Sequence, residues 1–304
     1  MRHQSHPVKT LVLTLTLALA GYSALPVRAG EAVTLTHVHG LSYSADGAQL
    51  LIPSHHGMAV YQGGRWSKAA GPAHDYMGFS ATRDALYSSG HPAPDSKLTN
   101  PFGLIKSRDG GKSWQKLGLE GESDFHTLAT SYATNAVYVF NHGTNSRMRQ
   151  AGIYYTLNDG LKWQRADAKG LPPKVTSLAV HPTDASLVAA GTEDGLYLSR
   201  NSAAGFERLV SGKQVLAASF DLNGEQLWFG TYSGEPALFR IGLKAGAKAE
   251  EVKLPPLTKD AVAYVAQNPD RRSEIAIATF KRSVYLSKDQ GGTWTQIAKE
   301  GATL

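Results

Sequence analysis

The chain has 304 residues, a formal net charge of +6 and no cysteine. Without cysteine it forms no disulfide, has no site for a cysteine-linked lipid anchor and offers no thiolate to a metal ion. Its lysines and arginines are scattered, without a basic helix or stripe, so the composition does not favour nucleic acid as a partner.

The first 29 residues predict an export signal. Arg2 and Lys9 supply positive charge near the start of the chain, and a short apolar segment, LVLTLTLALA, follows at 11–20. This segment is shorter than a membrane span, and no later one approaches about 20 apolar residues. Removal of residues 1–29 takes away three positive charges and no acid, which leaves +3. We therefore expect export to the periplasm, no membrane span after cleavage, and a single domain over residues 30–304.

The mature part of the chain repeats one strand pattern. Six units, each close to the 40–50 residues of a propeller blade, begin near His37, His74, Asp124, Lys174, Val215 and Asp260. Short strands rich in valine, tyrosine and threonine, separated by Gly and Asp turns, predict antiparallel sheets, and no segment has sustained helical periodicity. Four-stranded units closed into a ring form a β-propeller. The expected fold is an all-β propeller of six blades, or of seven if two units near 210–260 have been merged. The segment AVTL (32–35) is expected to add an edge strand to the last blade.

A shorter motif recurs within these units. Three segments match closely, SRDGGKSW (107–114), TLNDGLKW (156–163) and SKDQGGTW (287–294), and SRNSAAGF (199–206) is a weaker copy. We expect the carboxylates of Asp109, Asp159 and Asp289 to accept hydrogen bonds from backbone N–H groups in the turn. The tryptophan is expected to pack between neighbouring sheets. These aspartates are therefore predicted to be structural and not catalytic.

The motif Ser/Thr-x-Asp-x-Gly-x-Thr/Ser-Trp resembles the Asp-box, or BNR, repeat of sialidase-like and sortilin-like β-propellers. The chain is similar to exported bacterial members that are labelled glycosylhydrolase-like, and to the photosystem-assembly-factor type, which is a binding scaffold. The resemblance to sialidases implies three channel arginines and an Arg-Ile-Pro signature. That signature is missing, and the first strand has His37 and His39 where an arginine would be needed. Sialidase activity is therefore not expected, and any other enzymatic activity stays open.

Histidine is concentrated in the first three units. Eight imidazoles fall there, nearly all of them beside the same two strand positions of the repeat: His37, His39, His55, His56, His74, His91, His126 and His142. Ring closure would bring them to one side of the central channel. Imidazole is the commonest metal ligand, so this placement predicts a site for a transition metal ion, with copper or zinc ahead of others. Metal-bound imidazoles are neutral, so affinity is expected to fall as the pH drops through about 6.5.

Four further side chains are candidates to support this site. Asp75 and Asp124 could bind the ion or orient an imidazole, Met77 could add a soft donor, and Glu193 stands at a corresponding place in the fourth unit. Two alternatives stay open. One is a glycoside hydrolase, in which two of these carboxyls act as a pair on a sugar or another small polar ligand. The other is a non-catalytic scaffold that binds another exported protein. No nucleotide cofactor is expected.

Overall fold

The computed structural model describes residue 1 and residues 33–244 and 246–304; the predicted export signal lies outside them apart from Met1. The strands of the first three sheets are β1 (Ser42–Tyr43), β2 (Leu50–Ser54), β3 (Gly57–Gln62), β4 (Arg65–Lys68), β5 (Asp75–Ala81), β6 (Leu86–His91), β7 (Ile105–Ser107), β8 (Gln115–Lys116), β9 (Leu128–Thr130), β10 (Val137–Asn141), β11 (Gly152–Thr156) and β12 (Gln164–Arg165).

The strands of the last three sheets are β13 (Val175–Val180), β14 (Val188–Thr192), β15 (Gly195–Ser199), β16 (Glu207–Ser211), β17 (Gln214–Phe220), β18 (Gln226–Tyr232), β19 (Pro236–Gly242), β20 (Glu250–Val252), β21 (Val262–Gln267), β22 (Ile275–Thr279), β23 (Val284–Ser287), β24 (Thr295–Lys299) and β25 (Ala302–Thr303). The described residues contain no helix, and hence none that is long and apolar enough to cross a membrane.

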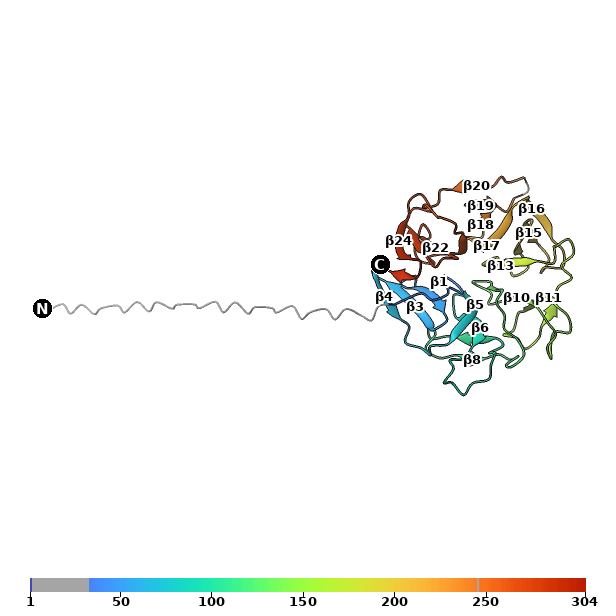
Figure 1. Cartoon of the computed structure of the whole chain (residues 1–304), viewed down its shortest axis with the longest axis horizontal. Helices are drawn as coiled ribbons and strands as arrows, with labels where there is room; N and C mark the ends of the chain where they lie inside the picture. Colours follow the sequence, from blue (N-terminus) through green and yellow to red (C-terminus); the bar gives the residue numbers. More distant parts are fainter. Residues whose placement is uncertain (2–32, 245) are drawn as a thin grey trace. The chain divides into compact units, whose positions relative to one another are not determined.

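Six antiparallel sheets follow one another around a central axis, so the fold is the expected six-bladed propeller (Figure 1). Five sheets have four strands in sequence order, and the sixth has a fifth strand, β25. The first strand of each sheet lies nearest the axis, and β1 contacts β21, which closes the ring. The two-unit merger that would have given seven blades does not occur, because β17 to β20 form one complete sheet.

Each boundary between neighbouring sheets contains its own apolar cluster. Between the sixth and first sheets, Leu35, Ile52 and Ala276 are fully or almost fully buried. Repeating this layer six times builds the core as a ring of sheet-on-sheet contacts. The motif tryptophans Trp114, Trp163 and Trp294 pack against these clusters, as expected.

The expected edge strand joins the last sheet. Thr34 pairs with Ala302 in an antiparallel bridge, and the N–H of Leu35 donates to the carbonyl of Gly301 (2.8 Å). Thr303 Oγ1 donates to the carbonyl of Val33 (2.8 Å). Residues from both ends of the described ring therefore complete one sheet, which ties the ring shut.

The Asp109 and Asp289 turns share one hydrogen-bond pattern. Oδ1 of Asp109 accepts the N–H of Ser113 (2.9 Å) and Oδ2 accepts its hydroxyl (2.6 Å). Oδ1 of Asp289 accepts the N–H of Thr293 (2.8 Å) in the same way. These hydrogen bonds lower the pKa of both carboxyls to about 2. The two aspartates hold hairpin turns that lie away from the axis.

The prediction for Asp159 is wrong by one position. In this turn the capping oxygen belongs to Asn158, which accepts the N–H of Lys162 (2.9 Å). Asp159 has a positive φ of 56°. Its carboxylate accepts hydrogen bonds from the buried ammonium of Lys106 (2.8 and 2.9 Å) and from the hydroxyl of Tyr87 (2.7 Å). Asp159 therefore ties the third sheet to the second instead of capping its own turn.

Candidate functional site

Three imidazoles meet where the chain enters the first sheet. His37 and His39 lie just before β1, and His55 follows β2. The N–H of His39 donates to the carbonyl of Pro53 (3.2 Å), which holds the entering segment beside β2. Val38, between the two histidines, packs on the core. Because side chains of extended chain alternate in direction, the pattern His-Val-His places both imidazoles on the side opposite the core.

The three rings are in direct contact. The centroids of His37 and His55 are 4.3 Å apart, and the rings of His39 and His55 are stacked at 4.9 Å. One nitrogen of each ring can be chosen so that all three lie within 4.8 Å of one another. This is the one group of three or more metal-ligating side chains at such spacing among the described residues. We call these three side chains the His37 cluster.

Asp75, the first residue of β5, faces this cluster from the neighbouring sheet. Its Oδ1 lies 3.6 Å from Nε2 of His39, and its Oδ2 lies 3.9 Å from Nε2 of His55. Both Nε2 of His39 and Oδ1 of Asp75 are buried and have no hydrogen-bond partner. Burial lowers the pKa of His39 to about 4, although Asp75 opposes the shift and His55, His37 and His126 add to it. His39 is therefore a neutral imidazole at neutral pH.

A second group lies across the next sheet boundary. Asp124 precedes β9, and its Oδ2 lies 3.1 Å from Nε2 of His91, which ends β6, and 3.3 Å from Nδ1 of His126. The other ring nitrogen of His91, Nδ1, lies 2.7 Å from Oδ1 of Asn100. Oδ1 of Asp124 is buried without a hydrogen-bond partner. We call His91, His126 and Asp124 the Asp124 cluster.

The two groups use the same relation between neighbouring blades. A histidine at the end of a second strand, His55 or His91, reaches the aspartate that opens the following sheet, Asp75 or Asp124. In the fourth sheet the corresponding opening residue is Lys174, whose ammonium pairs with Glu193 (3.1 Å). A positive charge replaces the carboxylate there, so the pattern stops after the third blade.

Three of the eight predicted histidines do not join either cluster. His74 is buried against Phe102, and its Nδ1 accepts the N–H of Ala93 (3.0 Å), so that nitrogen is already used. His142 is exposed with its ring against Phe140. His56 is exposed, and within the described ranges it has no contact with another imidazole. The repeat alignment predicted where these three residues lie along the ring, but it did not predict the direction in which their side chains point.

Of the other two supporting candidates, Met77 stays a prediction and Glu193 lies elsewhere. Met77 is buried at the position in the second blade that corresponds to His39, and its carbonyl accepts the hydroxyl of Ser88 (2.8 Å). Glu193 is exposed and paired with Lys174, so it takes no part in the histidine site. Asn100 was not among the predicted residues, although its segment (90–104) contains His91 and three prolines. The Asn-Pro pair at 100–101 was the available signal that the chain turns back there.

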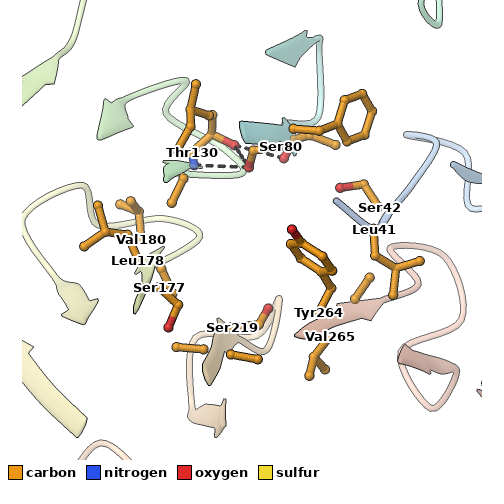
Figure 2. Close-up of a pocket in the computed structure, with 18 of the residues that line it drawn as sticks. Leu41, Ser42, Ser80, Thr130, Ser177, Leu178, Val180, Ser219, Tyr264 and Val265 are labelled. Atoms are coloured by element: carbon orange, nitrogen blue, oxygen red, sulfur yellow. Dashed lines mark hydrogen bonds between the residues drawn. The ribbon is translucent and has the colours of Figure 1, made fainter. Parts of the chain in front are cut away.

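Below the clusters, the inner strands enclose a cavity of about 280 Å³. His39 and His126 both line it, one from each cluster. Figure 2 shows hydroxyl groups from successive blades around it, including those of Ser42, Ser177 and Tyr264. No residue that lines it is an aspartate, glutamate, lysine or arginine. The channel is therefore polar and uncharged, and the titratable groups gather at one end of it.

No known family profile matches the chain, and no curated protein matches its sequence. Solved structures do match its fold. The GH74 enzyme of Niastella koreensis has a TM-score of 0.58 at 13% identity, over 88% of this chain and 46% of that one. The extracellular domain of the two-component system BT4673 of B. thetaiotaomicron has a TM-score of 0.55 at 16% identity, over 90% of this chain and 35% of that one. YCF48 bound to D1 peptide has a TM-score of 0.52 at 17% identity, over 90% and 85%.

The chain thus spans less than half the length of the first two of these proteins. At such identities the similarity shows the β-propeller fold and nothing about activity.

Proposed function

We propose that this protein binds a transition metal ion through the His37 cluster, with Asp75 as a fourth donor. Three imidazole nitrogens and one carboxylate oxygen suit Zn(II) or Cu(II) in a tetrahedral or tetragonal arrangement. The donors come from two neighbouring blades, so an ion bound here would join the first sheet to the second.

The observation that carries the proposal is the pair of orphaned atoms, Nε2 of His39 and Oδ1 of Asp75. Buried polar groups almost always have a hydrogen-bond partner, yet these two lie 3.6 Å apart and bond to nothing. Two donors on a tetrahedral zinc ion, with bonds near 2.1 Å, are about 3.4 Å apart. The gap is too long for a hydrogen bond and close to the spacing that a shared ion needs.

Burial adds a second argument, because His39 is held neutral. An imidazole must lose its proton before it can bind a metal ion. The pKa of His39 is lowered to about 4 by burial, so this ligand requires no deprotonation at neutral pH. Neutral imidazole in a partly buried site is the form that a metal ion uses.

The role that fits such a site is metal handling, or metal-dependent binding, by an exported protein. The periplasm is the compartment we propose for it. The alternative function is glycoside hydrolysis, which would need a carboxyl group that is free to act as acid or base. Asp75 and Asp124 each face two imidazoles, an arrangement that favours metal binding and orientation of rings over proton transfer to a sugar.

The test is titration of Zn(II) and Cu(II) into protein purified without a polyhistidine tag and stripped with chelator. We expect tight binding that is lost when His37, His39 and His55 are all replaced by Gln. His56→Gln is the matched control, because His56 adjoins His55 but lies outside the cluster. Binding equal in the triple variant and the wild type, or no binding at all, contradicts the proposal. Cleavage of a chromogenic glycoside by metal-free protein would support the hydrolase instead.

A further inference from the structure

The segment that leads the chain into the first sheet, residues 33–41, also takes part in closing the ring. Thr34 pairs with Ala302 of the sixth sheet, and His37 and His39 follow a few residues later. We call residues 33–41 the entering segment. We infer that an ion bound at the His37 cluster controls ring closure, so that it holds the entering segment in place and its release loosens that segment. This inference rests on the proposed function, because it assigns a regulatory consequence to the same site.

The first argument is that backbone pairing is short where the two histidines lie. The inner strand of the first sheet, β1, has two residues, whereas the inner strands of the other five sheets have three to seven. Within the described chain between Leu35 and β1, one backbone-to-backbone hydrogen bond lies outside the strand ladders. It runs from the N–H of His39 to the carbonyl of Pro53 (3.2 Å). The ladder that holds the other inner strands is therefore largely missing at this point.

The second argument concerns the contacts with the sixth sheet. The N–H of Leu35 donates to the carbonyl of Gly301 (2.8 Å), and the guanidinium of Arg282 donates from Nη1 to the carbonyl of Thr36 (2.9 Å). These contacts, like the bridge at Thr34, all precede His37 in the chain. The sixth sheet therefore holds the start of the entering segment, and coordination of His37 and His39 would hold the part that follows.

The third argument is the way the four proposed donors are divided. His37 and His39 belong to the entering segment, whereas His55 follows β2 and Asp75 begins β5. Movement of the entering segment away from the first sheet would break the bonds from two of the four donors. The free energy of metal binding is therefore added to the free energy of opening. By linkage, anything that opens the ring here also weakens metal binding.

Release of the ion changes the surface of the protein as well as its charge. Val33, Leu35 and Leu41 are buried in the apolar cluster between the sixth and first sheets. Opening of the entering segment exposes these side chains and leaves the edge of β25 without its neighbour. Metal occupancy is thereby converted into a change of structure at the point where the ring closes.

The experiment is amide hydrogen exchange followed by mass spectrometry on tag-free protein. It compares chelator-stripped protein with protein at a free Zn(II) concentration of about 100 times the Kd, and the bound metal is measured in the same samples. In the metal-free protein, residues 33–41 should exchange faster than β14. Zn(II) should slow their exchange about 100-fold, as expected for an opening that releases the ion, or to the rate of β14 if that limit is reached first. The outer strand β16 is the control, and its exchange should not change.

A matched pair of variants tests the closing contacts without touching a metal ligand. Thr303→Val keeps the shape of the side chain and removes the hydroxyl that donates to the carbonyl of Val33. Exchange of residues 33–41 in the metal-free protein should become about fivefold faster, the effect of losing one hydrogen bond, and Zn(II) should slow it again. Thr176→Val removes a hydroxyl that donates to the carbonyl of Val215, between the fourth and fifth sheets, and should leave that exchange unchanged.

The outcomes separate this inference from the function on which it rests. Zn(II) that binds without slowing the exchange of residues 33–41 overturns the inference and leaves the proposed function standing. The same holds if these residues exchange as slowly as β14 in the metal-free protein, because the ring then stays closed without the ion. Equal exchange of residues 33–41 in the two variants also contradicts the inference. Absence of bound metal overturns both proposals.

Discussion

The indole N–H of Trp66, in the first sheet, donates to the carbonyl of Ile297 in the sixth, at 3.0 Å. It lies where the chain begins and ends its ring, beside the bridge between Thr34 and Ala302. This closure matters for the proposed site because the His37 cluster belongs to the first sheet. The imidazoles keep their positions only while that sheet is held between its two neighbours.

Replacing Trp66 by Phe should lower the free energy of unfolding by about 1 kcal/mol through loss of this hydrogen bond, beyond any change in packing. Trp163→Phe is the matched control, since the Trp163 indole packs on a sheet boundary but makes no hydrogen bond within the described residues. Urea denaturation measures the free energy of unfolding of both variants. Equal losses in the two variants would show that the hydrogen bond adds nothing.

The contact between Lys106 and Asp159 predicts that replacing Asp159 lowers the free energy of unfolding more than replacing Asp109, although both aspartates lie in copies of the same motif. Lys106 is 2% exposed and depends on Asp159 for its counter-charge. Asp159→Ala leaves this ammonium buried and unpaired, which should cost about 2–3 kcal/mol, less than for a fully buried pair because Asp159 is partly solvated. Asp109→Ala removes only a turn cap, at about 1 kcal/mol. Thermal or urea unfolding measures the stability of the two variants. Equal destabilisation would contradict the role of Asp159 as the counter-charge of Lys106.

Much of the fold followed from the sequence, because strand spacing and turn residues are local signals. Six blades were predicted and confirmed, and the edge segment before His37 does complete the last sheet. The error at Asp159 arose because two polar residues, Asn158 and Asp159, stand side by side in that turn. Counting from Thr156 by the spacing of the other copies would have selected Asn158.

The site was predictable only in part. Repeat alignment gave the angular position of each histidine around the ring, and it placed His37, His39 and His55 near Asp75. It did not show that His74 is drawn into the sheet boundary by the N–H of Ala93. Contacts of that kind depend on loop conformation, which the repeat does not encode.

The buried imidazole of His39 predicts a pH dependence of stability in the metal-free protein. Its pKa is about 4 in the folded state and about 6.5 in the unfolded chain. Between these values the unfolded chain binds more protons, so the free energy of unfolding falls as the pH drops from about 6.5 to about 4. The contribution of His39 to the free energy of unfolding changes by about 3 kcal/mol across that pH range and does not change outside it.

Urea unfolding in the presence of a chelator, at several pH values, tests this against His39→Gln. The variant should show a shallower pH slope between about 4 and 6.5, because it lacks the titrating group. Identical slopes in the two proteins would mean that His39 is not held neutral by the fold.

Asp75 can be tested separately from the histidines. Asp75→Asn keeps the shape of the side chain but removes its charge, and we expect metal affinity to fall about 10–100-fold, the loss typical of removing such a partner. Asp167→Asn, in an exposed position of the third blade, is the control and should leave affinity unchanged. Calorimetric titration of both variants gives the comparison. An unchanged affinity in Asp75→Asn would exclude this carboxylate from the site.

The most direct measurement is an anomalous diffraction map at the zinc or copper edge, from crystals of tag-free protein grown with that ion. The account predicts a peak in bonding contact with nitrogens of His37, His39 and His55. A map without a peak at those nitrogens, or with its strongest peak at an unrelated surface site, would contradict it.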